Sequence, residues 1–215
     1  MKSVLVVGLG RFGRTVIKKL NELGHEVMAI DNDEERVQSV MPYVDSAQIG
    51  DSTDRVFLES LGIPDFDLCI VTIGDDFLDS LETTSLLKEL GAQKVVARAS
   101  RDRYEKFLLR NGADYVVYPE REMAEWTAIR YSADHVFEYI ELDAESAIVE
   151  IEVPHEWINK SLGQLAIRQK YHVNVLAMRD HGRLRTDLNA DTVFVDGTRV
   201  LILGFLKDLQ KFLRG

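Results

Sequence analysis

The sequence has little of what secreted, membrane-spanning or nucleic-acid-binding proteins need. Its 215 residues include one cysteine, Cys69, which excludes a disulfide framework and a thiolate metal site. No apolar run approaches the roughly 20 residues of a membrane span, and the apolar run at 4–7 is too short for a signal peptide. Lys and Arg total 26 against 36 Asp and Glu, so the net charge is -10. A basic surface for nucleic acid is therefore not expected, and we predict a cytoplasmic protein.

What is present suits a globular α/β protein. Hydrophobic residues make up 46% of the chain, enough to bury a core in which Cys69 is expected to lie. Short apolar runs alternate with helical segments in the first half, as in parallel strands joined by helical crossovers. The expected strands are 3–7, 26–30, 46–50, 67–73, 94–99 and 114–119. The fold class is therefore α/β, a Rossmann-like, doubly wound parallel sheet of six strands.

The helix expected after Pro119 has an apolar stripe that includes Met123, Trp126 and Ile129. Such a stripe is typical of a helix packed on its own sheet, and the alternative is a bridge to a second subunit or lobe. Beyond it, apolar and acidic side chains alternate, which indicates strands with one solvated face. We expect a first domain over residues 1–135 that includes this crossover helix, and a small α+β lobe over 136–215.

The second lobe has its own pattern of expected elements. His181 and Gly182 separate two short apolar runs and favour a tight hairpin between them. The expected strands are 145–154, 173–180, 182–186 and 198–204, and the expected helices are 161–171 and 205–215.

The stretch VVGLGRFGRT places Gly8, Gly10 and Gly13 at the spacing of a dinucleotide-binding turn. Gly8 permits the turn, Gly10 lets the backbone approach phosphate, and Gly13 lets the helix pack closely on the strand. The helix that begins there offers unpaired N–H groups to an anion, and Phe12 belongs to the same expected binding loop. Arg11 is slightly unfavourable at a helix N-terminus unless an anion lies nearby, and its alternative role is a solvated surface residue.

Asp31 ends the second expected strand about 20 residues further on, where a carboxylate accepts hydrogen bonds from ribose hydroxyls. Its charge disfavours a 2′-phosphate, so the adenosine half of NAD, ADP or ATP would fit. The alternative for Asp31 is a helix cap, a role that Asn32 or Asp33 could equally take. We include Asn32 among the expected binding residues.

Other strand ends supply further candidates, because ligands bind at the carboxyl edge of open α/β sheets. Asp51 and Ser52 follow the third strand, Gly74 follows the fourth and Arg98 ends the fifth. Asp51 could instead cap a helix that begins near Thr53. Arg98 could instead be an exposed surface residue.

These segments, in this order, resemble the RCK family (regulators of conductance of K⁺), the cytosolic gating subunits of Ktr and Trk potassium uptake systems. The resemblance rests on GLGRFGRTVIKKLNELGHEVMAIDNDEERV, GDSTD, SLLKELGAQKVVARA and NGADYVVYPEREMA, and it continues from SAIVEIEVP to the closing helix. It implies a nucleotide-sensing subunit that is not an enzyme. ATP and ADP would bind at the glycine loop and favour different ring shapes, with NAD(H) as an alternative ligand.

The resemblance also implies partners. The chain would dimerise through the crossover helix at about 120–134 and form an octameric ring. The ring would lie on the inner face of the plasma membrane, bound to an integral K⁺ channel subunit. Arg11 would approach the terminal phosphate of a nucleotide held by the neighbouring subunit, while Arg98 would face the phosphates.

The resemblance assigns two further ligand positions. Glu120 matches a family glutamate that helps to hold Mg²⁺ or Ca²⁺ near the phosphates, and its alternative role is an acidic first-turn residue. Some members bind cyclic di-AMP in the C-terminal lobe, for which Ile167, Arg168 and Asn174 are the residues to compare. The sequence leaves that ligand undecided.

The main alternative is an NAD-dependent oxidoreductase, which needs a general acid or base beside the reacting carbon, often a histidine. No histidine ends a strand of the first domain; the five are His25, His135, His155, His172 and His181. A nucleotide-binding structural protein without a transporter partner predicts the same sheet and stays open.

Overall fold

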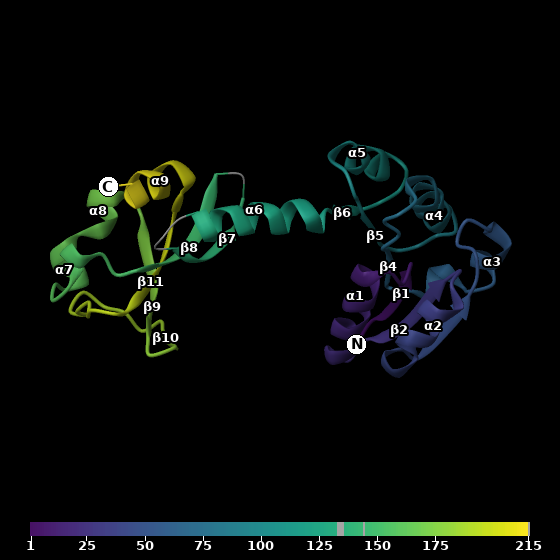
Figure 1. Cartoon of the computed structure of the whole chain (residues 1–215), viewed down its shortest axis with the longest axis horizontal. Helices are drawn as coiled ribbons and strands as arrows, with labels where there is room; N and C mark the ends of the chain where they lie inside the picture. The colour runs from purple at the N-terminus through teal and green to yellow at the C-terminus, as the bar shows by residue number, and fades with distance from the viewer. Residues whose placement is uncertain (133–135, 144, 215) are drawn as a thin grey trace. The chain divides into compact units, whose positions relative to one another are not determined.

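The computed structural model describes residues 1–132, 136–143 and 145–214. The chain divides into two compact units, Met1–Glu122 and Met123–Gly215, and the division falls within helix α6 (Pro119–Ser132) (Figure 1). His135, at the predicted boundary between residues 135 and 136, lies outside the described residues, as do positions 133 and 134 at the end of the expected crossover helix. That boundary stays a prediction.

The first unit contains a six-stranded parallel sheet with the order β3-β2-β1-β4-β5-β6. Its strands are β1 (Ser3–Val7), β2 (Glu26–Asp31), β3 (Ser46–Ile49), β4 (Leu68–Val71), β5 (Val95–Arg98) and β6 (Tyr115–Val117). The strand order reverses between β1 and β4, which places a crevice at the carboxyl ends of these strands. The predicted doubly wound sheet is confirmed.

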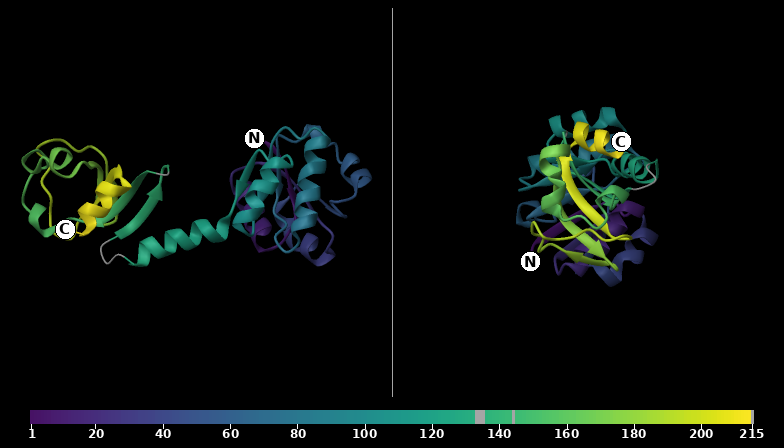
Figure 2. Two further views of the ribbon diagram at one scale, coloured as in Figure 1. Left: turned by 90° about the horizontal axis from the view of Figure 1, so that it is seen from above. Right: turned by 90° about the vertical axis from the view of Figure 1, so that its left-hand side faces the viewer.

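Helices cover both faces of this sheet (Figure 2). Successive side chains of β1 point to opposite faces, so Val4 and Val6 pack with α1 and α2, whereas Leu5 and Val7 pack with α3, α4 and α5. The helices are α1 (Arg11–Glu22), α2 (Glu34–Val40), α3 (Arg55–Glu59), α4 (Phe77–Glu89) and α5 (Asp102–Arg110), with 3-10 turns η1 (Met41–Tyr43) and η2 (Ile63–Asp65).

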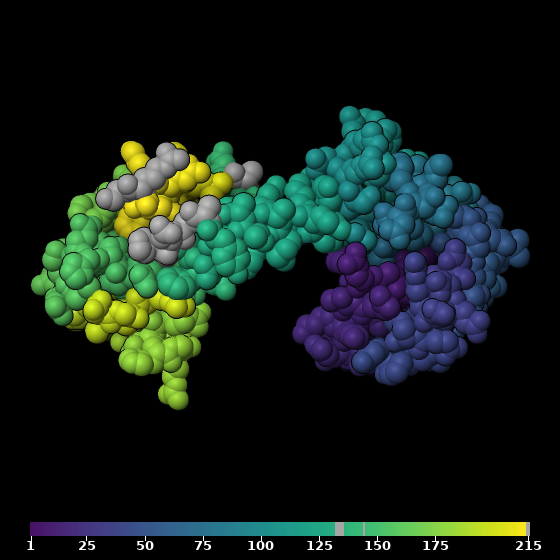
Figure 3. Space-filling view, viewed as in Figure 1, coloured from purple at the N-terminus to yellow at the C-terminus, as the bar shows by residue number. Residues whose placement is uncertain are grey.

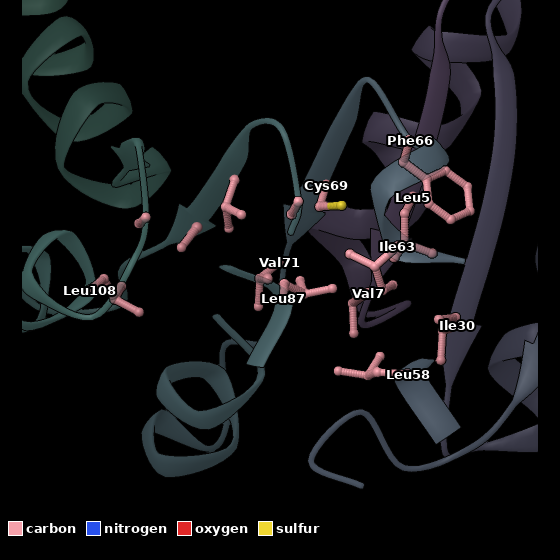
Figure 4. Close-up of a cluster of buried hydrophobic side chains, with 14 of the residues drawn as sticks. Leu5, Val7, Ile30, Leu58, Ile63, Phe66, Cys69, Val71, Leu87 and Leu108 are labelled. Carbon is pink, nitrogen blue, oxygen red and sulfur yellow. The ribbon is translucent and has the colours of Figure 1, made fainter. Parts of the chain in front are cut away.

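Cys69 lies in the hydrophobic core that also contains Leu5 and Val7, as predicted (Figure 4). Its side chain is fully buried, and burial raises the pKa of the thiol to about 12. The thiol therefore stays protonated near neutral pH and packs as a small apolar residue.

The second unit contains a five-stranded antiparallel sheet with the order β10-β9-β11-β8-β7. The strands are β7 (Val136–Glu141), β8 (Ser146–Glu152), β9 (Asn174–Asp180), β10 (Arg183–Arg185) and β11 (Arg199–Phe205), and the helical segments are η3 (His155–Trp157), α7 (Leu162–Leu165), α8 (Ile167–Tyr171) and α9 (Leu206–Arg214). The predicted hairpin is confirmed, because β9 and β10 pair across His181 and Gly182. The small α+β lobe expected from the sequence is therefore present.

Two expectations for this unit were wrong. Strand β7 was not expected, although its apolar residues alternate with acidic ones as in a strand with one solvated face. The single helix expected over 161–171 is two helices, since Ala166 takes a left-handed conformation with φ 45°. The first of these helices, α7, is bonded to a segment distant in the sequence, because the N–H groups of Leu162 and Gly163 donate to the carbonyls of Thr192 and Ala190.

The core of the second unit centres on Trp157, which is fully buried against Tyr171, Phe194 and Phe212. In the space-filling view, side chains cover the backbone of each unit on the face that is seen in Figure 1 (Figure 3). Within the described residues, we find no helix with the length and apolar character to cross a bilayer.

Candidate functional site

A cavity of about 730 Å³ opens at the carboxyl edge of the first sheet, a size that suits a small-molecule ligand. It belongs entirely to the first unit. Eleven of the twelve nucleotide- and metal-site residues expected in the first domain line it: Gly8, Gly10, Arg11, Phe12, Asp31, Asn32, Asp51, Ser52, Gly74, Arg98 and Glu120. Gly13, the twelfth, is buried in α1 and does not line the cavity.

The three glycines of the loop have different surroundings. Gly8 has φ +91°, and a Cβ there would lie 3.0 Å from the backbone nitrogen of Ile73. A Cβ on Gly13 would overlap the carbonyl oxygen of Gly8 and lie 2.5 Å from Oγ1 of Thr72. A Cβ on Gly10 would meet no atom within 4 Å. The loop therefore needs Gly8 and Gly13 for its own packing, whereas Gly10 leaves open space at the cavity.

Helix α1 begins at this cavity without a cap from its own chain. Gly10 is its N-cap residue, no side chain accepts a hydrogen bond there, and its first turn has no acidic residue. Asp33, Asp54 and Asp76 cap α2, α3 and α4 through their carboxylates, and α5 has acidic residues in its first turn. The N-terminus of α1 is thus the one among α1 to α5 that has no carboxylate of its own to meet its partial positive charge.

Asp31 is buried at the end of β2, with 6% of its surface exposed. Its Oδ2 accepts a hydrogen bond from the backbone N–H of Leu9 at 2.5 Å, and its Oδ1 accepts one from Asp33 at 2.9 Å. The carboxylate has about four acceptor positions, so it can still accept ribose hydroxyls. Asp31 is not the helix cap that the sequence left open, because Asp33 caps α2.

The residues that follow β3 are partly engaged within the chain. Asp51 accepts hydrogen bonds from the N–H and hydroxyl of Thr53, which lowers the pKa of Asp51. It does not cap α3, since Asp54 does. The Ser52 hydroxyl is buried 2.8 Å from the hydroxyl of Thr83 on α4. These contacts fix the loop that forms one wall of the cavity.

Arg98 ends β5 with 18% of its side chain exposed, so it is not the solvated surface residue that the sequence left open. Its Nη2 pairs with the carboxylate of Glu120, and its guanidinium carbon lies 5.5 Å from the centre of the Phe12 ring. A Cβ on Gly74 would collide with this guanidinium. Gly74, Phe12 and Glu120 therefore surround Arg98 at the cavity wall.

The sequence reasoning missed several residues that line the cavity, among them Arg14, Arg36 and Asp79. Arg14 follows Arg11 by three positions on the same helix, a spacing that places both side chains on one face. Arg36 lies 3.7 Å from Oδ2 of Asp31. Desolvation raises the pKa of Asp79, and the nearby charges of Asp76 and Asp51 raise it further.

Arg11 is exposed at the cavity mouth, and its guanidinium makes no ion pair or hydrogen bond within the part of the chain that the structure describes. Across the described residues, no group of three or more His, Cys, Asp or Glu side chains is arranged to hold a metal ion. A cation at Glu120 stays a prediction, in which phosphate oxygens would supply the other ligands.

The residues compared for cyclic di-AMP lie in the second unit. Ile167 is buried at the start of α8, Arg168 is exposed on the same helix, and Asn174 is half-buried at the start of β9. Their arrangement leaves that ligand undecided.

Comparison with known proteins identifies the family. The model of the TrkA-N domain matches residues 4–119, and the model of the TrkA-C domain matches residues 147–214. The chain therefore belongs to the RCK family of proteins with TrkA-N and TrkA-C domains, as expected from the sequence.

Within this family, the chain is similar to curated potassium uptake proteins. It is 38% identical over 211 residues to Ktr system potassium uptake protein C of Bacillus subtilis (strain 168), which covers 98% of this chain and 96% of the relative. It is 36% identical over 211 residues to Ktr system potassium uptake protein A of the same organism, with 98% and 95% covered.

Solved structures share the fold. The GsuK RCK domain has a TM-score of 0.70 at 19% identity, covering 99% of this chain and 47% of that chain. The GsuK channel bound to NAD has a TM-score of 0.71 at 20% identity, covering 100% and 39%. GsuK bound to ADP has a TM-score of 0.54 at 19% identity, covering 60% and 34%. This chain spans less than half the length of these GsuK chains.

Proposed function

We propose that this chain is the nucleotide-sensing, non-catalytic gating subunit of a Ktr-type potassium uptake system. The observation that carries the proposal is the uncapped N-terminus of α1, which opens into the cavity beside the buried carboxylate of Asp31. A polyphosphate would accept hydrogen bonds from the first N–H groups of α1. The ribose hydroxyls would donate to Asp31, and similarity to Ktr proteins supports potassium uptake as the process.

ATP and ADP are the proposed ligands, with NAD(H) as the alternative. Arg11 has no partner within the described residues, and in a ring it would reach the terminal phosphate held by the neighbouring subunit. A guanidinium binds phosphate through two charge-assisted hydrogen bonds, so it can distinguish three phosphates from two. Nucleotides can shift the ring only by a difference in affinity for its shapes, and Arg11 would supply that difference. Glu120 would hold Mg²⁺ or Ca²⁺ with the phosphate oxygens.

The proposed assembly is a dimer through α6 that builds an octameric ring on an integral K⁺ channel subunit. The exposed side chain of Met123 on α6 supports such a contact. The ring would therefore be peripheral to the inner face of the plasma membrane.

Calorimetry with ATP, ADP and NADH, together with native mass spectrometry, tests this function. The wild type is expected to bind an adenosine nucleotide and form at least a tetramer. Arg11→Ala is expected to lose the ATP-over-ADP preference of the ring, whereas Lys19→Ala, on α1 but outside the cavity lining, is expected to retain it. A chain that binds no adenosine nucleotide, or stays monomeric with it, would contradict the proposal. Turnover of NADH would favour the oxidoreductase alternative.

A further inference from the structure

Arg98 is a cation whose bonding capacity is only partly used within the described residues. Its guanidinium pairs with Glu120 through Nη2, and its Nε is buried without a hydrogen-bond partner. A guanidinium carries five N–H donors in a fixed plane. Arg98 can therefore bind a further anion, and a buried donor without a partner favours one.

The surroundings hold Arg98 in place at the cavity. The ring of Phe12 lies over its guanidinium carbon at 5.5 Å, and Gly74 has no side chain that would displace it. Phe12 belongs to the first turn of α1, so the guanidinium lies near the proposed phosphate position. Little side-chain entropy remains to be lost when an anion binds to such a restrained arginine.

Glu120 also lines the cavity, and its side chain is 55% exposed. A phosphate beside Arg98 would meet the negative charge of Glu120 at close range. The two anions would repel each other, and both accept hydrogen bonds from the same guanidinium.

We propose that Glu120 competes with the terminal phosphates for Arg98, so that nucleotide binding breaks the Arg98–Glu120 ion pair and Glu120 lowers affinity according to phosphate charge. This inference rests on the proposed nucleotide function and adds how the affinity of its site is set. A divalent cation would offset the repulsion, because it binds both the carboxylate and the phosphate.

Breaking the Arg98–Glu120 ion pair would also affect helix α6, since Glu120 is in its first turn. The next residue, Arg121, pairs with Asp102 and Glu105 on α5 at 3.2 Å each. The start of α6 is thus tied at two places, to the cavity through Glu120 and to α5 through Arg121. Nucleotide binding would release the first contact and leave the second.

The test measures ADP and ATP binding to the full chain by calorimetry in buffer with EDTA. Glu120→Gln keeps the shape of the side chain and an acceptor oxygen but removes the charge. We expect this variant to bind ADP about fivefold more tightly than the wild type, because one partly exposed charge repulsion is removed. Its affinity for ATP is expected to increase by a larger factor, since ATP carries more phosphate charge. Glu125→Gln, an exposed position on α6 outside the cavity lining, is the control and is expected to leave both affinities unchanged.

Equal or weaker binding by Glu120→Gln in EDTA would overturn the inference while leaving the proposed function intact. A wild-type chain that binds neither nucleotide would overturn the proposed function and this inference with it. A double-mutant cycle tests the role of Arg98: in an Arg98→Gln background, Glu120→Gln is expected to change the ADP affinity less than twofold. A gain that persists there would show that Glu120 acts on phosphate without Arg98, contrary to the competition.

Discussion

Alanine substitutions at two glycines of the same loop are expected to have different effects. One should lower the stability of the first unit, and the other should weaken nucleotide binding. Gly13 is in the first turn of α1, and a Cβ there would overlap the carbonyl oxygen of Gly8. That oxygen belongs to the backbone, so it cannot rotate away as a flexible side chain would. Overpacking costs about 1–3 kcal/mol, and the better helix propensity of alanine returns at most about 1 kcal/mol. Gly13→Ala is therefore expected to destabilise the first unit by about 1–2 kcal/mol.

Gly10→Ala is the matched substitution with the opposite result. Gly10 has φ -62° and ψ -174°, which any residue adopts, and its Cβ would contact no protein atom within 4 Å. Alanine in place of glycine at an N-cap costs less than about 1 kcal/mol. The new methyl group would occupy the space beside the N–H groups of α1 and push a phosphate away. Loss of one charge-assisted hydrogen bond, about 1.5–3 kcal/mol, corresponds to at least about tenfold weaker ADP binding.

Urea unfolding, hydrogen exchange of β1 and α1, and ADP calorimetry measure the two effects separately. Hydrogen exchange is needed because the chain has two units, and it reports the opening of the first unit alone. Gly13→Ala with wild-type protection in β1 would refute the close approach of α1 to the glycine loop. Gly10→Ala with wild-type ADP affinity would refute phosphate binding at the N-terminus of α1.

Two further predictions concern stability. The pKa of Asp114 is lowered chiefly by hydrogen bonds from Lys88 at 2.8 and 2.9 Å. This pair therefore stabilises the fold at pH values above the unfolded aspartate pKa of about 3.9, and the stabilisation is lost as pH falls through the folded pKa. Urea unfolding should therefore show Lys88→Gln less stable than wild type at pH 7, with the difference shrinking at pH 3; a difference independent of pH would contradict this. Ala166→Gly is expected to stabilise the second unit by about 1 kcal/mol, because φ 45° is unfavourable for alanine. The control, Ala124→Gly on α6, should destabilise the protein by about 1 kcal/mol, because glycine is unfavourable within a helix. Equal changes in the free energy of unfolding for the two variants would argue against backbone strain at Ala166.

The first sheet could be predicted because its signals are local. Continuous apolar runs such as 3–7 and 67–73 can be satisfied only by strands covered on both faces. Glycines follow the ends of intervening helices, and Asp76, which precedes the first residue of α4, caps that helix. Each signal lies within a few residues of the element that it specifies, so no knowledge of distant contacts was needed.

The contacts at the site could not be predicted in the same way. Arg98 and Glu120 are each recognisable as candidates, but their pairing depends on the place of β5 in the sheet and on where α6 begins. Asp51 and Asp54 both precede the same helix, and Asp54 is its cap because the Asp54 carboxylate accepts hydrogen bonds from Val56 and Phe57. These choices depend on tertiary geometry rather than on residue type.

The proposed binding of phosphate at the glycine loop would stabilise the first unit. Helix α1 begins without a side-chain cap, and Arg11 and Arg14 lie in its first turn, where the helix dipole disfavours a positive charge. A missing cap costs about 1 kcal/mol, so the free chain has a weak helix start at its cavity. A bound polyphosphate would accept the free N–H groups and neutralise the arginines, and at about 100 times its Kd it would stabilise the fold by about 2.7 kcal/mol. The same residues that weaken α1 without a ligand are therefore the ones through which a phosphate would strengthen it.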